Sequence, residues 1–156
     1  MVSSLRLWRL CRDLHAAEAF TGKGPFRYGG RWNPPGVAVV YCAESRSLAA
    51  MEILVHHLGT EVFQLTRWVV IAADVPEDLI EKPKRVPETW REQSPVAAAQ
   101  EFGAAWVREK RSAVLRVPSA VVLGEFNYLL NPAHADFTKM TVGKPEPFLF
   151  DPRFKG

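Results

Sequence analysis

Three side chains that could act together on one ligand lie within residues 29–57. This segment reads GGRWNPPGVAVVYCAESRSLAAMEILVHH and carries Arg31, Tyr41 and Glu52. A guanidinium binds phosphate oxygens through paired hydrogen bonds, and a tyrosine offers a face on which a flat ring can stack. A carboxylate stabilises a sugar carbon that becomes cationic as its bond breaks. The three residue types therefore predict a site for a ligand with phosphates, a flat ring and a reactive sugar, such as NAD.

The residues around Arg31 predict a turn that leads into a strand. Two glycines precede Arg31 and the sequence Pro34-Pro35-Gly36 follows it, which is turn chemistry on both sides. Val37–Cys42 is an unbroken apolar run, which is typical of a buried strand, and Tyr41 lies near its end. Arg31 and Tyr41 are thus expected on two rigid, neighbouring elements.

An amphipathic helix is predicted from about Ser47 to Leu58, with Ser45 or Ser47 as its N-terminal cap and Gly59 at its end. Apolar side chains recur in it at three- and four-residue spacing, which predicts one stripe facing the core. The stripe consists of Leu48, Met51, Val55 and Leu58. Glu52 falls at the edge of this stripe, so we expect it to be half-buried and able to point into a cleft.

The rest of the chain predicts a compact α+β fold with more sheet than helix. Residues 5–12, which include Trp8 and Arg9, are predicted as a strand or a short helix, and residues 20–35 as a loop. Further strands are expected at 62–65, 68–75, 113–117, 120–123 and 147–150. Ser94 and Pro95 are expected to begin a helix that runs from Val96 to about Lys110. Polar or turn-rich segments are expected at 80–93 and 127–136.

Composition and charge are typical of one globular domain that spans residues 1–156, with 47% hydrophobic and 24% charged residues. The net charge of +3 suits an anionic small ligand or an acidic partner surface, and does not by itself predict nucleic-acid binding. No apolar run approaches the roughly 20 residues that span a bilayer. Arginines interrupt the apolar stretch at the N-terminus, unlike in a signal peptide, so we expect a cytoplasmic protein.

Neither a metal site nor a disulfide is expected. Cys11 and Cys42 are too few and too far apart for a metal knuckle or a disulfide framework. The four histidines, at 15, 56, 57 and 134, show no ligand spacing such as H-E-x-x-H. The sequence also lacks the G-x-G-x-x-G fingerprint of a Rossmann-type dinucleotide site. We therefore expect no bound cofactor, and NAD as a substrate that is consumed.

Two blocks of the sequence resemble the RES domain, which is named for an arginine, a glutamate and a serine. They are GGRWNPPG–VVYCAES–SLAAMEILVH within 29–57 and VPSAVV–NYLLNPAH within 117–134. RES domains form the toxin half of RES–Xre toxin–antitoxin pairs in bacteria. The resemblance implies a fold like that of the ADP-ribosyltransferases, with central antiparallel or mixed sheets and flanking helices. It also implies attack on NAD by hydrolysis, by phosphorolysis or by transfer of ADP-ribose to a protein.

The resemblance assigns functional roles to four positions. The arginine, tyrosine, glutamate and serine of the family fall on Arg31, Tyr41, Glu52 and Ser119. The expected catalytic residues are Arg31, Tyr41 and Glu52, and the expected NAD contacts include Arg31, Tyr41 and Ser119. Because nicotinamide leaves as a neutral group, the reaction needs no strong general acid, which fits a site without an obvious second carboxylate.

Arg9 and Asn127 are two further candidates for NAD contacts. Arg9 is either a second phosphate contact or half of a structural ion pair. Asn127 is either a ligand contact or, as is common before a turn, a cap for backbone groups.

The catalytic candidates also have structural interpretations. Arg31 in a turn is ordinarily a surface charge, and Tyr41 at the end of an apolar strand ordinarily belongs to the core. Glu52 on a helix edge ordinarily pairs with His56, four residues further on.

The leading function is a toxin that cleaves NAD at the nicotinamide–ribose bond, and transfer of ADP-ribose to a protein is a close alternative. An RNA-targeting toxin is the alternative from another class, although the tryptophans at 8, 32, 68, 90 and 106 are dispersed along the chain. The resemblance implies an Xre-like antitoxin as partner in a hetero-oligomer, with any DNA contact made by the antitoxin and no membrane contact. The basic segment Lys82–Arg85 either rims the cleft or faces water.

Overall fold

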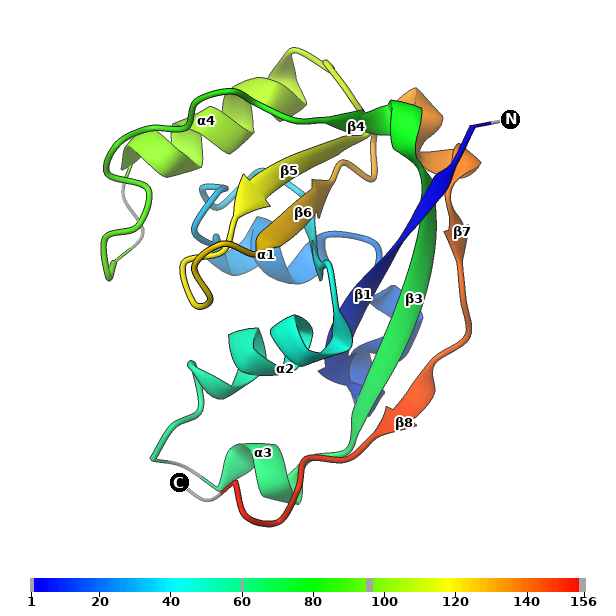
Figure 1. Ribbon diagram of the computed structural model, residues 1–156, viewed down its shortest axis with the longest axis vertical. Helices are drawn as coiled ribbons and strands as arrows, with labels where there is room; N and C mark the ends of the chain where they lie inside the picture. The colour runs from blue at the N-terminus through cyan, green and yellow to red at the C-terminus, as the bar shows by residue number, and fades with distance from the viewer. Residues whose placement is uncertain (1, 60, 95–96, 155–156) are drawn as a thin grey trace.

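The computed structural model describes residues 2–59, 61–94 and 97–154 (Figure 1). The strands in this part of the chain are β1 (Ser4–Arg12), β2 (Val40–Ala43), β3 (Trp68–Pro76), β4 (Ile80–Glu81), β5 (Val114–Pro118), β6 (Phe126–Leu130), β7 (Thr141–Val142) and β8 (Glu146–Phe148). The α-helices are α1 (Lys23–Tyr28), α2 (Arg46–Leu54), α3 (Val62–Leu65) and α4 (Ala97–Arg108). Short 3-10 helices lie at Asp13–Glu18, Glu77–Leu79 and Ala135–Lys139.

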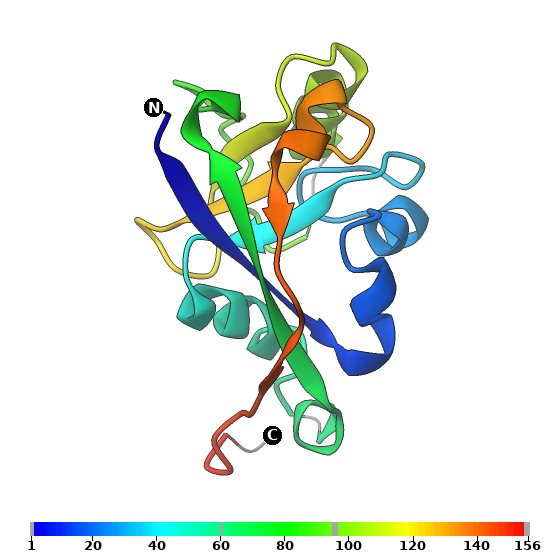
Figure 2. The ribbon, with the colours of Figure 1, turned by 90° about the vertical axis from the view of Figure 1, so that its right-hand side faces the viewer.

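All of these strands belong to one mixed sheet, which consists of two halves. The strand order is β4-β5-β6-β2-β1-β3-β7, and β8 also pairs with β3, further along the edge that β7 occupies (Figure 2). β4 and β5 are parallel, and the other pairs are antiparallel. β1 and β3 pair over nine residues, whereas β1 and β2 meet at the pair Trp8↔Ala43. This short junction lets β5 and β6 take a different direction from β1 and β3 (Figure 1).

Helices α4 and α2 lie on one face of the sheet, above and below β5 and β6 in the view of Figure 1. Trp106 of α4 packs in a cluster with Leu115 and Leu129 of β5 and β6. Leu48 of α2 packs in another cluster with Leu10 of β1. Further clusters bury other parts of the sheet, and the largest contains Leu7, Val40, Val114 and Leu130. The two helices therefore flank the central strands β2 and β6, which carry Tyr41 and Asn127.

The α+β class and most of the predicted strands are confirmed. Residues 5–12 form a strand rather than a short helix, and the strands predicted at 68–75, 113–117 and 147–150 correspond to β3, β5 and β8. The strand predicted at 37–42 begins later, at Val40, because the N–H of Val37 donates to the carbonyl of Pro34 within the preceding turn.

Other predicted elements are wrong. Residues 62–65 form a single helical turn, α3, rather than a strand, because a segment of four residues is too short to show a period. Residues 120–123 form a turn, since Ser119 Oγ accepts the N–H groups of Val121 and Val122 and keeps them from a sheet. The loop predicted at 20–35 contains α1, the loop predicted at 80–93 begins with β4, and the turn-rich segment predicted at 127–136 begins within β6. The predicted helix start at Pro95 and Val96 lies outside the described residues.

The predicted core stripe of α2 is also wrong. Leu48 is buried, but Met51, Val55 and Leu58 expose 43%, 45% and 68% of their surface, and the helix ends at Leu54 instead of Leu58. The buried side of α2 instead carries Leu48 and Ala49, whose small side chain lets the helix approach the sheet. Glu52 lies one turn beyond these two residues on the same side, so this rotation directs it toward β6. None of the helices in the described part of the chain has the length and apolar character that a membrane span requires.

Candidate active site

The Glu52 carboxylate on α2 is held by an amide on the neighbouring strand β6. Asn127 Nδ2 donates to Glu52 Oε2 at 2.9 Å, and both residues are half-buried. The bond between them replaces the pairing with His56 that helix spacing alone would favour. Asn127 therefore acts neither as a backbone cap nor as an isolated amide, because its side chain orients a carboxylate. Glu52 Oε1 makes no hydrogen bond in the described chain, so it is available to a ligand.

Strand register places Tyr41 beside Asn127 on the same face of the sheet. Ala43 pairs with Asn127, and Tyr41 pairs with Leu129. Residues two apart on a strand point to the same face, and diagonal neighbours on paired strands lie about 7 Å apart. The candidate residues Tyr41 and Glu52, more than ten positions apart in sequence, are thus brought to one surface through Asn127.

The Tyr41 hydroxyl fastens β2 to the turn that carries Arg31. It donates to Asn33 Oδ1 at 2.6 Å and accepts the N–H of Trp32 at 3.1 Å. A Cβ at Gly30 would lie 2.6 Å from this hydroxyl, so the approach requires glycine. Burial raises the pKa of Tyr41 above its ordinary value, although the nearby charge of Arg31 lowers it. The hydroxyl therefore stays protonated at neutral pH, and the ring is the part of Tyr41 suited to ligand binding.

The guanidinium of Arg31 is anchored to a distant loop. Arg31 Nη1 donates to the carbonyl of Trp90 at 2.8 Å and to that of Glu92 at 2.7 Å. Within the described residues the other two guanidinium nitrogens make no hydrogen bond, which leaves them for phosphate oxygens. The same loop carries the basic segment Lys82–Arg85 further upstream, whose three basic side chains are exposed.

Arg9 lies on β1 with its side chain on the opposite face of the sheet from Tyr41, because its neighbour Trp8 is the residue that pairs with Ala43. Its Nη1 donates to the carbonyl of Tyr41 at 3.0 Å, across the junction between the two halves of the sheet. Its Nε is buried and has no hydrogen-bond partner among the described residues. No carboxylate in the described chain pairs with Arg9, so the alternative of a structural ion pair is not realised there. Because this nitrogen is buried, and the side chain lies on the face of the sheet opposite Tyr41, the predicted contact of Arg9 with NAD stays a prediction.

Ser119 has a structural role in the turn after β5. It is 1% exposed, and its hydroxyl accepts the N–H of Val121 at 3.1 Å and that of Val122 at 3.0 Å. It lies near Asn127, because Val117, two residues earlier, pairs with Asn127. The predicted contact of Ser119 with NAD stays a prediction, since its oxygen already accepts two backbone donors.

Sequence reasoning missed Asn33, which is fully buried between the turn and β2. Its amide donates to the carbonyls of Pro25, Pro34 and Val37, and its Oδ1 accepts the Tyr41 hydroxyl. The sequence held one signal for it, because Asn33 is a polar residue that lies between Trp32 and the pair Pro34-Pro35.

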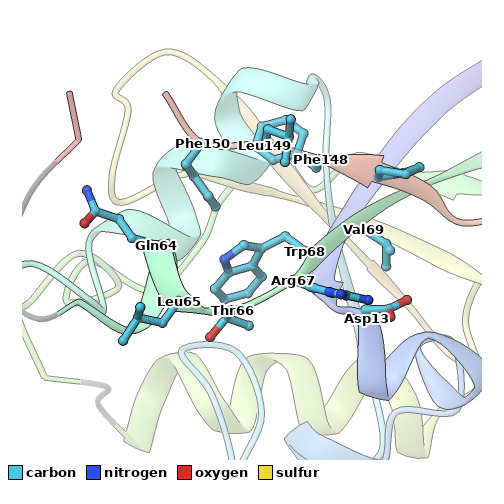
Figure 3. Close-up of a pocket in the computed structure, with 11 residues that line it drawn as sticks. Asp13, Gln64, Leu65, Thr66, Arg67, Trp68, Val69, Phe148, Leu149 and Phe150 are labelled. Carbon is cyan, nitrogen blue, oxygen red and sulfur yellow. The ribbon is translucent and has the colours of Figure 1, made fainter. Parts of the chain in front are cut away.

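The described residues of this region support neither a cysteine nucleophile nor a bound metal ion. Burial raises the pKa of Cys42, adjacent to Tyr41, to about 12, so its thiol is not a nucleophile at neutral pH. The described residues contain no group of three side chains suited to a metal ion. A hollow of about 490 Å³ lies elsewhere, between α3, the start of β3 and residues 147–150, and contains none of the candidate residues (Figure 3).

Comparison with known proteins identifies the family. The model of the RES domain matches residues 6–151. The chain belongs to the RES domain family. A Sphingobium sp. (strain YBL2) protein named Prs ADP-ribosylating toxin is 37% identical over 153 residues, or 94% of each chain. Toxin Res of Yersinia enterocolitica is 36% identical over 152 residues, covering 97% of this chain and 100% of the relative. The resemblance to RES-domain toxins is therefore confirmed.

A solved structure supports the fold. A chain in the crystal structure of the M. tuberculosis MbcT–MbcA toxin–antitoxin complex matches 96% of this RES domain, with a TM-score of 0.76. The match covers 86% of that chain at 18% identity, so it bears on the fold. The expected fold class, a single α+β domain with a mixed sheet and flanking helices, is confirmed.

Proposed function

We propose that this RES-domain toxin consumes NAD by breaking the bond between nicotinamide and ribose, with water or inorganic phosphate as the acceptor. The observation that carries the proposal is the Glu52 carboxylate, oriented by Asn127 on the sheet face that also carries Tyr41. Arg31, whose charge lies near the Tyr41 hydroxyl, supplies positive charge that the phosphates of NAD require.

In the proposed reaction the C–N bond breaks and its electron pair goes to the ring nitrogen, so nicotinamide leaves uncharged. The ribose carbon becomes cationic, and Glu52 stabilises that charge through its free oxygen. Water or phosphate then adds to the carbon, and a water proton passes to Glu52 or to solvent. The face of Tyr41 would stack on the nicotinamide ring.

Transfer of ADP-ribose to a protein is the second candidate. The name of the Sphingobium relative, Prs ADP-ribosylating toxin, favours it. The same residues would cleave NAD, and a side chain of the target protein would replace water as the acceptor.

We also propose an antitoxin partner of the Xre type that forms a hetero-oligomer with this toxin. The similarity to a chain of the MbcT–MbcA toxin–antitoxin complex supports a partner of this kind. Because NAD is an intracellular metabolite, the proposed site of action is the cytoplasm.

Chromatography of NAD incubated with the purified protein, with and without phosphate, tests the reaction. Glu52→Ala is the test variant, and Glu61→Ala, which removes an exposed carboxylate, is the control. We expect the wild type and Glu61→Ala to release nicotinamide, and Glu52→Ala to leave NAD intact. ADP-ribose as the product identifies water as the acceptor, and its 1″-phosphate identifies inorganic phosphate.

Two further results would change this conclusion. If the purified protein leaves NAD intact but labelled NAD modifies a protein in a cell extract, a protein side chain replaces water or phosphate as the acceptor, and protein ADP-ribosylation is the function. If neither occurs with the wild type, the proposed NAD chemistry is wrong.

A further inference from the structure

Two described segments, residues 86–94 and 97–103, contact the turn that carries Arg31. Gln100 of α4 donates from Nε2 to the carbonyl of Gly30 at 3.0 Å. A Cβ at Gly103 would lie 1.8 Å from the carbonyl oxygen of Trp32, so α4 rests directly on the backbone of the turn. The position of Arg31 is therefore set by contacts that lie about 60 to 70 residues further along the chain.

Trp90 makes two kinds of contact with this turn. Its indole stacks on that of Trp32, with ring centroids 6.0 Å apart and planes inclined by 20°. Its backbone carbonyl accepts from Arg31 Nη1, and its own N–H donates to the carbonyl of Pro87 at 3.0 Å. The stack thus holds the loop at the place where its carbonyls meet the guanidinium.

These contacts determine which part of the Arg31 side chain faces a ligand. A guanidinium is planar, so fixing Nη1 between the carbonyls of Trp90 and Glu92 fixes the directions of its remaining donors. The neighbouring residue Trp32 donates its N–H to the Tyr41 hydroxyl. A shift of the turn would therefore move Arg31 and Tyr41 together.

We propose that Trp90 is a positioning residue of this site, which holds the Arg31 guanidinium in the orientation that binds the phosphates of NAD. Trp90 acts through Arg31 and touches no reacting atom. The ligand part of this inference rests on the proposed function, whereas the contact with Arg31 does not.

Phe102 provides a matched control. It also packs on Trp32, with ring centroids 5.9 Å apart and planes at 61°, but its backbone lies within α4 and gives Arg31 no carbonyl. Truncation of Phe102 removes a similar aromatic contact and leaves the anchor of Arg31 in place. Comparison of Trp90→Ala with Phe102→Ala therefore separates positioning from packing.

The first measurement is independent of NAD. Nitrogen-15 NMR of the arginine side chains, with the Arg31 signal assigned by its loss in Arg31→Lys, reports the hydrogen exchange of its guanidinium. We expect Trp90→Ala to raise that exchange rate by about tenfold, and Trp90→Phe and Phe102→Ala to change it by less than about threefold. An unchanged rate in Trp90→Ala would overturn the proposal, whether or not the protein consumes NAD.

The second measurement is steady-state kinetics of NAD consumption. We expect Trp90→Ala to raise KM by about tenfold with a smaller change in kcat, and Trp90→Phe to restore KM. In an Arg31→Ala background, Trp90→Ala should add less than about twofold to KM, because the residue through which it acts is gone. An equal increase in both backgrounds would show that Trp90 acts independently of Arg31 and would overturn the proposal.

The two measurements also distinguish this inference from the proposed function. A wild type that consumes no NAD and modifies no protein refutes the proposed function, and with it the role in phosphate binding, while the exchange rate still decides the contact with Arg31. A wild type that consumes NAD while Trp90→Ala keeps the wild-type KM refutes the positioning role alone.

Discussion

Arg31 and Glu52 differ in how many parts of the fold hold them in place. The turn of Arg31 lies between β2, α4 and the 86–92 loop, and its neighbours Trp32 and Asn33 are 2% and 0% exposed. Glu52 lies on a helix of nine residues, and the residue before it, Met51, is 43% exposed. In the described chain its side chain is held by one hydrogen bond, from Asn127.

The contrast indicates that the two ends of the site respond differently to substitution. Changes in the core around the Arg31 turn remove packing and buried hydrogen bonds. Their main effect should therefore be a lower free energy of unfolding. Changes at Glu52 remove a half-buried carboxylate from a lightly covered helix, so they should alter chemistry and leave stability nearly unchanged. The experiments below test this difference, beginning with the largest expected effect.

Glu52→Ala should lower kcat for NAD cleavage by about 10²- to 10³-fold, the usual loss when a group that stabilises transition-state charge is removed. Its melting temperature should stay within about 2 °C of the wild type, because a change of at most 0.5 kcal/mol is typical for such a position. Both values come from NAD chromatography and thermal unfolding of the same preparation. A large loss of stability would show that Glu52 helps to hold the fold together, and would contradict the proposed difference between Glu52 and the Arg31 turn.

Gly103→Ala should destabilise the protein by about 3 kcal/mol, because its Cβ would overlap the carbonyl oxygen of Trp32 at 1.8 Å. This corresponds to a fall in melting temperature of roughly 10 °C. Gly24→Ala is the matched control, since a Cβ at Gly24 meets no atom within 4 Å. Equal melting temperatures for the two variants would contradict the close approach of α4 to the turn.

Tyr41→Phe should cost about 1–3 kcal/mol of unfolding free energy at pH 7, because the buried N–H of Trp32 loses its acceptor. The raised pKa of Tyr41 means that the folded state holds the phenol proton more tightly than the unfolded state. This contribution is complete below the unfolded pKa of about 10 and declines as the pH rises above it. The difference between the two proteins should therefore shrink from pH 9 to pH 11 in urea unfolding.

Tyr28→Phe is the control for that series, because Tyr28 is 78% exposed. Its unfolding free energy should follow that of the wild type at every pH. A difference between Tyr41→Phe and the wild type that does not change with pH would show that the phenol ionises alike in both states.

Asn127→Ala should lower kcat by about tenfold with little change in KM, because the carboxylate of Glu52 loses the hydrogen bond that orients it. Asn127→Ala combined with Glu52→Ala should be no slower than Glu52→Ala alone. If the losses in kcat from the two substitutions add in the double variant, Asn127 contacts the ligand directly, as the sequence-based hypothesis holds.

Ser119→Ala should have the smallest effect, a loss of about 1 kcal/mol in stability and less than a threefold change in KM, because its hydroxyl accepts two backbone N–H groups of the turn. Urea unfolding and NAD kinetics measure the two quantities. A tenfold increase in KM would instead establish Ser119 as an NAD contact.

The elements of the fold differed in how well they could be predicted. The turn at Arg31 and the strand β3 were evident, because glycine and proline mark turns and apolar runs mark buried strands. α3 and the 119–125 turn were missed, because the first is too short for a period and the second depends on one hydroxyl that accepts two N–H groups. The rotation of α2 was missed, because its most apolar stripe is not the side that packs on the sheet.

By itself the sequence determined the family, the residue types of the candidate site, and the turn, strand and helix that carry Arg31, Tyr41 and Glu52. Local spacing suffices for these, because turns, strands and helix caps depend on residues a few positions apart. Only the tertiary structure decided that Asn127 orients Glu52 and that the Trp90 loop anchors Arg31. These partners lie 75 and 59 positions apart in sequence, so the packing of distant segments selects them, and no local pattern encodes that choice.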